Sequence, residues 1–280
     1  MTDTDTDTDT ATETDSTITD TTTGAADTTA TAADTTAYEA AASGARGRLV
    51  VLDMAGTTVA DGGLVERAFE RAAERLGVRP GTPDHAEKLR YVLATMGESK
   101  ISVFRHLFGT EERARRANSA FEEAYGELVD GGLVSEVPGA RAAIEELRAD
   151  GRTVVLTTGF ARVTQDAILD ALGWRDLADL TLCPADAGGR GRPHPDMVLT
   201  AFLRTGAAAD VRDERHVRDV RDVVVVGDTA YDMLSGRRAG AGTVAGVLTG
   251  AHDRATLTRH GATHVLGSVA ELPRLLAEPV

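Results

Sequence analysis

Three aspartates in two short motifs are the residues of this 280-residue chain best suited to chemistry. Asp53 begins the motif Asp-x-x-Gly-Thr-Thr, and Asp228 and Asp232 belong to the motif Gly-Asp-Thr-x-x-Asp. A carboxylate can attack phosphorus and form an acyl phosphate, and carboxylate oxygens are hard ligands that suit Mg²⁺. We therefore expect Asp53 to act as a nucleophile and the three acids together to bind a magnesium ion.

Two further motifs offer groups that bind a phosphoryl group. The hydroxyl of Thr158 and the backbone N–H groups around Gly56 and Gly159 can hold phosphoryl oxygens. Arg192, followed by a proline, supplies a fixed cation for the charge on the transferred group. We therefore expect Thr158 and Arg192 to be catalytic, and Gly56, Thr57 and Gly159 to bind substrate.

The segments that precede these motifs are predicted to be parallel strands. Four short apolar runs each end in a polar loop, at residues 49–52, 153–156, 222–226 and 244–247. They are apolar throughout and are separated by amphipathic helical sequence, which is typical of a parallel sheet covered on both faces. Such sheets bind ligands at the carboxyl ends of their strands. The sequence therefore predicts an α/β fold with all four motifs at one edge of one sheet.

One long segment interrupts the alternation of strands and helices. Residues 64–136 show helical periodicity and no convincing strand. Because the segment follows the loop of the first strand, we expect a helical cap over the carboxyl edge of the sheet. Paired glycines beside residues 61 and 130 are suited to hinges. The predicted helices are Leu64–Leu76, Asp84–Thr95, Ser99–Phe108 and Glu111–Val129, and the predicted units are a core of 46–62 and 134–280 and a cap of 63–133.

The composition excludes several classes of protein. The net charge of −14 comes from 44 acids and 30 bases, and such a balance argues against a nucleic-acid binder. Ten of the acids lie in residues 1–45, a Thr/Asp/Ala-rich segment with little to bury, which we expect to be a disordered tail. No apolar run is long enough to span a membrane. The single cysteine, Cys183, favours a reducing compartment, so we expect a cytoplasmic protein with Cys183 buried near a strand end.

The four motifs, in this order, resemble those of the haloacid dehalogenase superfamily over residues 48–275. The resemblance implies a Rossmann-like core, an aspartate nucleophile at Asp53, Mg²⁺ and a mobile cap. It also implies that Ala55 is a metal-binding position beside the three aspartates. A homodimer formed through the cap is a further expectation of the family.

Ala55 narrows the resemblance within that superfamily. Its phosphatases place a second aspartate two residues after the nucleophile, where it protonates the leaving alkoxide. Asp-Met-Ala-Gly-Thr-Thr is similar instead to the first motif of phosphonoacetaldehyde hydrolase (phosphonatase), which also has alanine there. That family carries Met-Gly-x-x-Lys in its cap, and this chain has Met96 and Lys100 at the matching positions. The resemblance implies that Lys100 forms a Schiff base with an aldehyde substrate and that Met96 contributes to substrate binding.

The lysine content supports a special role for Lys100. Twenty-eight of the 30 basic residues are arginines, and Lys88 and Lys100 are the two lysines of the chain. A guanidinium stays protonated and cannot form an imine, so an amine nucleophile must be lysine. We therefore predict a Mg²⁺-dependent hydrolase that cleaves the C–P bond of a small phosphonate such as phosphonoacetaldehyde.

The chain departs from the phosphonatase pattern at three positions. The family has a histidine three residues after its lysine, where this chain has Val103, and His106 lies six residues on. The tyrosine of the second motif is Phe160 here, and the cysteine after the first motif falls at Leu64. We expect His194, near Arg192, to lie on the surface.

Three alternatives remain open. A phosphatase acting on a phosphorylated metabolite such as phosphoglycolate would use Lys100 only to bind an anionic substrate. A non-catalytic protein with the same fold would not turn over substrate, although all the acids and Arg192 are present. A dehalogenase would not need the paired acids Asp228 and Asp232.

Overall fold

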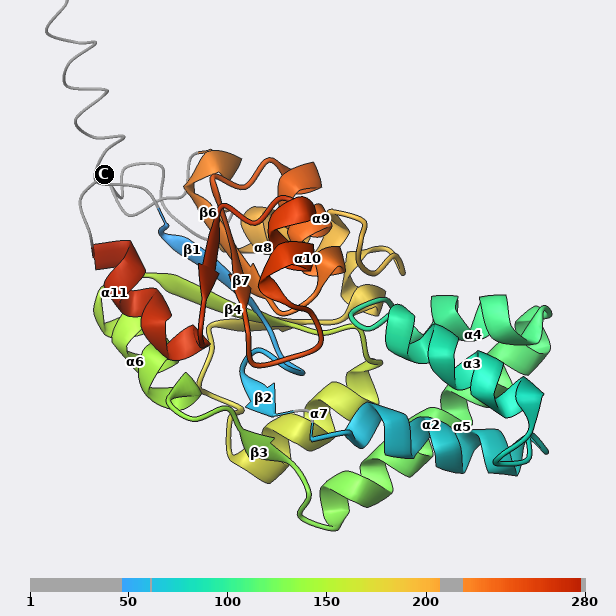
Figure 1. Ribbon diagram of the computed structural model, residues 1–280. Coiled ribbons are helices and arrows are strands. Elements are labelled where there is room, and N and C mark those ends of the chain that lie inside the picture. Colours follow the sequence, from blue (N-terminus) through green and yellow to red (C-terminus); the bar gives the residue numbers. More distant parts are fainter. Residues whose placement is uncertain (1–46, 61, 207–218, 278–280) are drawn as a thin grey trace, which may run out of the picture. The chain divides into compact units, whose positions relative to one another are not determined.

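The computed structural model describes residues 47–60, 62–206 and 219–277. The tail predicted for residues 1–45 lies outside the described residues. The described chain forms a six-stranded sheet with helices packed on it and a separate group of helices at one end of the sheet (Figure 1). The predicted α/β fold, a Rossmann-like parallel sheet with an inserted helical cap, is confirmed.

All neighbouring strands of the main sheet are parallel, in the order β5-β4-β1-β6-β7-β8. Strand β1 lies inside the sheet, and its alternate residues belong to two different apolar clusters, with Val50 and Leu52 in one and Leu49 and Val51 in the other. This is why the strand is apolar at every position. The strands are β1 Leu49–Asp53, β4 Thr153–Thr157, β5 Leu180–Leu182, β6 Val223–Gly227, β7 Thr243–Val247 and β8 His264–Leu266.

Helices connect the strands of the sheet and cover it. Their apolar side chains, such as Ile144, Ile168 and Met233, are fully buried against the sheet. The α-helices are α6 Ala140–Ala149, α7 Arg162–Leu172, α8 Asp196–Gly206, α9 Ala230–Ala239, α10 Arg254–Arg259 and α11 Leu272–Ala277, and the 3-10 helices are η1 Pro184–Ala187, η2 Val220–Asp222 and η3 Val269–Glu271.

The helices predicted for the cap are present, each within one or two residues of its expected ends. They are α2 Leu64–Arg75, α3 Pro83–Ala94, α4 Lys100–Phe108 and α5 Glu111–Asp130. Helix α5 packs on both α2 and α4. Thr82 and Thr110 cap the N-termini of α3 and α5 by accepting hydrogen bonds from backbone N–H groups three residues on.

A short two-stranded ladder joins the two ends of the cap. Strand β2 (Val59–Ala60) pairs antiparallel with β3 (Ser135–Glu136). The sequence predicts no strand in residues 64–136, and this is wrong at β3. The interpretation failed because two residues carry no periodicity, and the pairing joins segments about 75 positions apart. Strands β5 and β8 were missed for a similar reason, since each has three residues and lies at an edge of the sheet.

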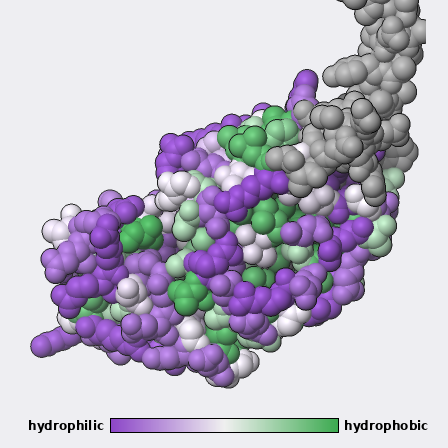
Figure 2. Space-filling model, turned by 180° about the vertical axis from the view of Figure 1, so that it is seen from behind, coloured by the Kyte–Doolittle hydropathy of each residue, from purple (hydrophilic) through white to green (hydrophobic). Residues whose placement is uncertain are grey.

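Polar residues cover most of the face shown in Figure 2, and apolar residues form small groups interrupted by polar ones. The exposed large apolar side chains include Leu203 on α8 and Val163 on α7. Among the described residues, we find no helix with the length and apolar character needed to cross a membrane. Cys183 is fully buried directly after β5, as the sequence predicts.

Candidate active site

The first, second and fourth motifs lie at the carboxyl ends of three adjacent strands. Asp53 is the last residue of β1, Thr158 follows β4, and Asp228 follows β6, and β1 pairs with both β4 and β6. The backbone N–H of Met54 donates to the carbonyl of Thr157 at 3.1 Å, which ties the first loop to the second. The parallel sheet therefore brings the motifs together at one edge.

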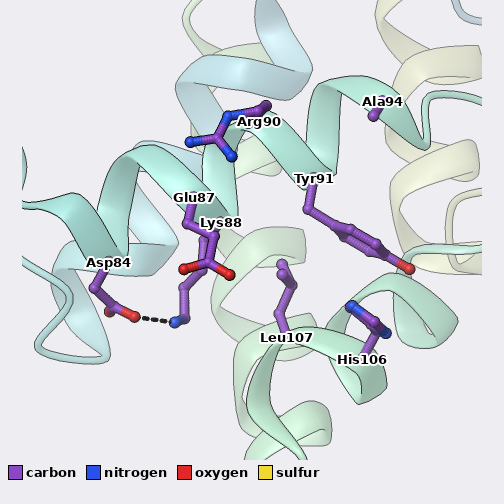
Figure 3. A pocket seen from close by; sticks show the side chains of 8 residues that line it. All are labelled: Asp84, Glu87, Lys88, Arg90, Tyr91, Ala94, His106 and Leu107. Carbon is purple, nitrogen blue, oxygen red and sulfur yellow. Dashed lines mark hydrogen bonds and ion pairs between the residues drawn. The ribbon is translucent and has the colours of Figure 1, made fainter.

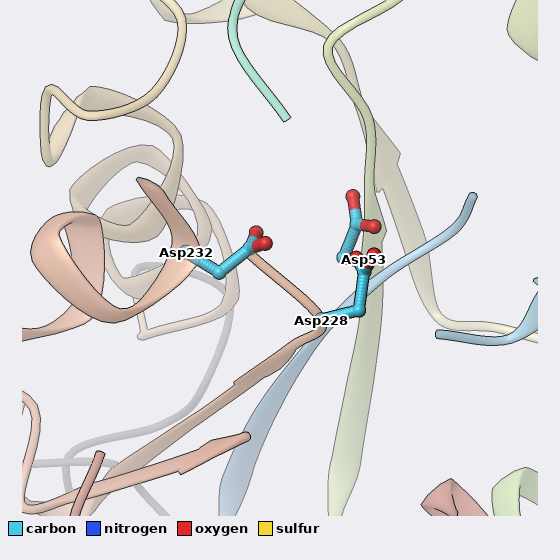
Figure 4. Close-up of side chains that lie close together, drawn as sticks. All are labelled: Asp53, Asp228 and Asp232. Atoms are coloured by element: carbon cyan, nitrogen blue, oxygen red, sulfur yellow. The ribbon is translucent and has the colours of Figure 1, made fainter. Parts of the chain in front are cut away.

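Three carboxylates meet at this edge. Asp53, Asp228 and Asp232, hereafter the aspartate triad, are each 5% exposed or less, and one oxygen of each lies within 4.8 Å of the others. Asp232 reaches the other two from the first turn of α9 (Figure 4). Three buried like charges at this spacing repel one another unless a cation lies among them.

Arg192 supplies one positive charge to this group. Its guanidinium donates to Asp53 Oδ1 at 2.6 Å through one nitrogen and to Asp232 Oδ1 at 2.7 Å through another. It also donates to the hydroxyl of Thr157 at 2.8 Å. Arg192 is 4% exposed. The third motif thus lies in the same site, as the sequence predicts, whereas Thr157 is a contact that the motifs did not indicate.

The pKa values of the site reflect burial first and the neighbouring charges second. Burial raises the pKa of Asp53 well above its usual range, against the effect of Arg192 and with a further rise from Asp232 and Asp228. Burial and then the charge of Asp232 raise the pKa of Asp228 to about 7. Burial opposes the charge on Arg192, but the three aspartates outweigh burial and raise the pKa of Arg192.

The surroundings of Asp228 leave room for its carboxylate and little else. A Cβ at Gly56 would lie 2.5 Å from Asp228 Oδ2, and one at Gly250 would lie 2.0 Å from it. The N–H of Ala251 donates to Oδ2 at 2.7 Å, and the hydroxyl of Thr57 donates to Oδ1 at 3.4 Å. Gly56 has a φ of +84°, which any other residue would adopt with strain.

The donor set fits a divalent cation of the hard type. Buried carboxylate oxygens are the ligands that Mg²⁺ prefers, and one guanidinium balances only one of three acids. Ala55 lies in the loop directly after Asp53 and Met54, where it can offer only its backbone carbonyl. The aspartate triad could therefore bind a metal ion, with Ala55 beside it.

His252 is a site residue that the sequence analysis missed. Its Nδ1 accepts the N–H of Ala230 at 2.8 Å, at the start of α9. The backbone N–H of His252 donates to the backbone carbonyl of Asp228 at 3.2 Å. His252 therefore holds the loop between Asp228 and Asp232 through its ring and its backbone, and burial lowers the pKa of its imidazole. Nothing in the local sequence indicates this contact, because the histidine comes from the loop after β7.

Thr158 lies in the loop between β4 and α7. It is buried, and its hydroxyl accepts the N–H of Phe160 at 3.2 Å, while its own N–H donates to the carbonyl of Leu182 at 3.2 Å. The loop therefore has a fixed conformation from Thr158 to Phe160, with Gly159 between them.

The cap loop, which we define as residues 95–99, packs into the core at this same edge. A Cβ at Gly97 would lie 2.4 Å from Thr229 Oγ1. A Cβ at Gly159 would lie 2.9 Å from the carbonyl oxygen of Glu98, and one at Gly191 would lie 2.6 Å from the Cβ of Ser99. Three glycines thus permit the cap loop to approach the second, third and fourth motifs closely.

Lys100 begins α4 directly after the cap loop. Its backbone N–H donates to the carbonyl of Gly159 at 3.3 Å, and the residue is only 5% exposed. Its Nζ lies 5.8 Å from the centre of the Phe160 ring. The structure therefore brings the predicted amine to the second motif. Met96 is partly buried in the cap loop, against the apolar cluster of the cap.

The positions that depart from the phosphonatase pattern have definite environments. Val103 is 1% exposed and belongs to the apolar cluster that also contains Val50 and Leu52, so its aliphatic side chain packs and takes no part in proton transfer. Leu64 is likewise buried, in the first turn of α2. The ring of Phe160 lies 4.8 Å from that of Tyr125 on α5. His194 is exposed, as expected, and so is His106.

Comparisons with known proteins agree with this geometry. The model of the haloacid dehalogenase-like hydrolases matches residues 48–240. The chain belongs to the haloacid dehalogenase-like hydrolases. Residues 48–240 contain all four motifs and the four cap helices.

Two curated relatives of this hydrolase bear different names. A phosphonoacetaldehyde hydrolase of Bacteroides fragilis is 30% identical over 246 residues, which cover 82% of this chain and 85% of the relative. A probable phosphatase, IndB, of Dickeya dadantii is 29% identical over 210 residues, which cover 73% of this chain and 82% of the relative.

Solved structures share the fold of this hydrolase. A phosphonoacetaldehyde hydrolase like protein of Oleispira antarctica has a TM-score of 0.66 at 24% identity, with 81% of this chain and 90% of that chain covered. A predicted phosphoglycolate phosphatase of Haemophilus somnus has a TM-score of 0.63 at 17% identity, with 82% and 97% covered.

Proposed function

We propose that this hydrolase is a Mg²⁺-dependent, phosphonatase-like enzyme that cleaves the C–P bond of a small phosphonate such as phosphonoacetaldehyde. The observation that carries the proposal is the position of Lys100. A chain with two lysines places one of them, buried, against the second motif of the site. The Bacteroides fragilis relative, which bears the name phosphonoacetaldehyde hydrolase, supports the same substrate.

In this proposal Lys100 activates the substrate. Its amine condenses with the aldehyde, releases water and forms a protonated imine. The imine accepts the electron pair of the C–P bond when that bond breaks, so the carbon group leaves as an enamine. Ala55 is compatible with this route, because a carbon leaving group stabilised as an enamine needs no proton from the position two residues after Asp53.

The core residues carry the phosphoryl group in the same proposal. A carboxylate oxygen of Asp53 attacks phosphorus as the C–P bond breaks, and water then attacks the aspartyl phosphate and releases phosphate. Arg192 balances the negative charge on the transferred group, while Thr158 and the N–H groups around Gly56 and Gly159 bind its oxygens, with Thr57 nearby.

The aspartate triad and the Ala55 carbonyl would hold Mg²⁺. When bound, the ion neutralises charge on the carboxylates and the phosphoryl oxygens, which lets an anionic nucleophile meet an anionic substrate. Burial is the main cause of the raised pKa values of Asp53 and Asp228, and the neighbouring aspartates add to it. A cation among these carboxylates would offset both effects and keep them ionised, which supports this assignment.

Reductive trapping tests the imine directly. Borohydride added during turnover of phosphonoacetaldehyde should leave a stable adduct, which peptide mass spectrometry should locate on Lys100. Lys100→Arg should abolish the adduct and turnover. Lys88→Arg is the matched control, since Lys88 is the other lysine and pairs with Asp84 on the same face of α3. Turnover by the wild type without an adduct on Lys100 would defeat the imine mechanism.

A phosphomonoesterase acting on a small phosphorylated metabolite is the second candidate. It is favoured by the probable phosphatase among the relatives and by the charge of Lys100, which could bind an anionic substrate. Lys100→Arg separates the two, because arginine keeps the cation and removes the amine. Retained phosphate release from phosphoglycolate or a sugar phosphate, with no release from phosphonoacetaldehyde by the wild type, would identify the phosphatase.

A further inference from the structure

Imine formation at Lys100 requires a partner that moves protons. An ammonium must lose a proton before its nitrogen can attack a carbonyl, and the resulting carbinolamine must gain a proton on oxygen before water leaves. Lys100 is 5% exposed, so bulk water has little access to it. The side chain one turn further along α4, Val103, is an aliphatic member of the cap's apolar cluster. This inference rests on the proposed function and concerns which residue supplies that proton transfer.

Glu98 lies in the cap loop, two residues before Lys100. It is half-buried, and its backbone carbonyl packs against Gly159, the same residue that accepts the N–H of Lys100. Its carboxylate interacts electrostatically with Lys100, His106 and His194. Glu98 and Lys100 are thus held together against the second motif by two backbone contacts.

Titratable groups from four elements interact electrostatically with the Glu98 carboxylate. Lys100 and His106 come from α4, and His194 comes from the loop before α8. The phenols of Tyr91 on α3 and Tyr231 on α9 also sense its charge. Burial raises the pKa of Glu98, although the interactions with Lys100, His106 and His194 act in the opposite direction. A raised pKa makes the Glu98 carboxylate a stronger base toward the Lys100 ammonium.

A cavity between α3 and α4 lies beside His106, one of the groups that act on the charge of Glu98. It has a volume of about 510 Å³, and Tyr91 and His106 form part of its wall together with Lys88 and Leu107. The rings of Tyr91 and His106 are stacked, with centres 4.1 Å apart and planes 10° from parallel (Figure 3). His106 is exposed, so solvent in the cavity can reach it. It also interacts electrostatically with Glu98.

We propose that Glu98 is the general acid and base for imine formation at Lys100, and that it exchanges protons with solvent through His106 and the cavity between α3 and α4. The Glu98 carboxylate takes one proton from the Lys100 ammonium. The neutral amine forms a C–N bond with the carbonyl carbon, and a second proton moves from nitrogen to oxygen. Protonated Glu98 then gives its proton to the carbinolamine hydroxyl, and the nitrogen lone pair expels water to give the protonated imine.

The protons in this sequence balance without any further reactant. One ammonium and one carbonyl become one protonated imine and one water, and Glu98 returns to its ionised form. The enamine left by C–P cleavage must gain one proton on carbon to become the protonated imine of the product, and in this proposal that proton comes from solvent through His106 and Glu98. Hydrolysis of the product imine then runs the steps of its formation in reverse. Glu98 is therefore required at formation and at release of the covalent intermediate, and His106 at the protonation of the enamine between them.

Glu98→Gln in the full chain is the main test, because it keeps the size of the side chain and removes the titratable group. We expect kcat/KM for phosphonoacetaldehyde and the rate of borohydride trapping at Lys100 to fall by about 10²-fold. The acidic limb of the pH profile should disappear. Glu122→Gln is the matched control: Glu122 is a half-buried glutamate of α5 that hydrogen-bonds with Asn118, and its loss should leave both rates unchanged.

Two further variants separate proton transfer from a structural role. Glu98→Ala should regain activity when formate is added, since a small carboxylate can replace the missing group, and no regain would indicate a structural role. His106→Phe keeps a ring against Tyr91 and removes the nitrogens; its activity should fall and should recover with added imidazole. Unchanged activity of His106→Phe would overturn the route through the cavity.

Different results would overturn the role of Glu98 and the imine mechanism on which it rests. An absence of any adduct on Lys100 in the active wild type would defeat the imine mechanism itself. If the wild type is trapped, and Glu98→Gln changes neither the rate of trapping nor its pH dependence, only the role of Glu98 is overturned.

Discussion

The two sides of the active site are built in different ways. The core side consists of charged side chains at the ends of β1 and β6 and on α9, each fixed by hydrogen bonds or ion pairs of 2.6–3.4 Å. The cap side consists of a single loop and the first residue of α4, and backbone contacts at Gly97, Gly159 and Gly191 hold it in place. Charge therefore organises the core side, and close packing organises the cap side.

This difference separates two parts of the chemistry. In our proposal the aspartate triad and Arg192 contact only the phosphoryl group. The core side can therefore transfer this group from substrates with different leaving groups. The cap side selects the leaving group, since Lys100 and Glu98 act on the carbonyl end of the substrate. Variants on the two sides should therefore differ in the range of substrates that they affect, as well as in the size of the effect.

The largest effect is expected at the nucleophile. Asp53→Asn should lower phosphate release from every substrate, phosphonate or phosphate ester, by on the order of 10⁴–10⁶-fold, because no aspartyl phosphate can form. The measurement is steady-state phosphate release with Mg²⁺. An equal loss on all substrates supports a core side that is indifferent to the leaving group, whereas a loss confined to one substrate would contradict that division.

A smaller and more selective effect is expected at the amine. Lys100→Arg should lower kcat/KM for phosphonoacetaldehyde by about 10³-fold, or about 4 kcal/mol of transition-state stabilisation. Any slow hydrolysis of simple phosphate esters should persist, because the core side is intact. Parallel assays of both substrates measure the selectivity. Equal losses on the two would show that Lys100 serves the phosphoryl group instead of the carbonyl.

A packing variant tests how the cap side is held. Gly97→Ala places a Cβ where Thr229 lies, so it should displace Lys100 and lower kcat/KM by about 10²-fold. Gly77→Ala is the control: its φ of +80° carries the same backbone cost of about 1–2 kcal/mol, but nothing lies within 4 Å of the added atom. Similar activities in the two variants, each compared at equal folded fraction, would show that the close approach at Gly97 is unimportant.

The smallest effect is expected on thermal stability when Asp228 is replaced. Its pH dependence tests whether the core side carries unbalanced negative charge. The pKa of Asp228 is raised to about 7, so the folded state binds its proton more tightly than the unfolded state does. Ionisation therefore costs stability, which falls as the pH rises from about 4 through 7. Without metal, Asp228→Asn should raise the Tm at pH 8 by roughly 2–4 °C for each kcal/mol recovered, and the gain should vanish near pH 4.

Scanning calorimetry with and without Mg²⁺ completes this test. Mg²⁺ should raise the Tm of the wild type more at pH 8 than at pH 5, since ionised carboxylates bind the ion and protonated ones do not. Asp228→Asn should lose most of that gain. A Tm gain that is independent of pH, or equal in the variant, would show that the ion binds elsewhere.

The core side could be predicted from the sequence because its signals are local. Continuous runs such as Val223–Val226 identify buried parallel strands, and parallel strands bring their carboxyl ends to one edge. The positions of Asp53 and Asp228 follow from that rule alone. The same rule overlooks β5 and β8, since a three-residue edge strand has too little sequence to show a pattern.

The cap side and the supporting contacts could be predicted only in part. Lys100 was identified by its rarity and by the spacing from Met96, but the role proposed for Glu98 depends on packing that brings α4, α9 and the loop at His194 together. His252 supports the loop of Asp228 from a segment more than 20 residues away. Contacts of this kind arise from the tertiary structure and leave no periodic trace in the chain.

The ladder of β2 and β3 has a consequence for the origin of such enzymes. Because Ala60 pairs with Ser135 and Val59 with Glu136, the cap is topologically the loop of a β-hairpin whose two stem strands lie side by side. The entropy of closing a loop grows only slowly with its length. A stem of this kind tolerates the exchange of one loop for another of different size. Recombination can therefore give the enzyme a new cap, and with it a new substrate specificity, while the catalytic sheet stays unchanged.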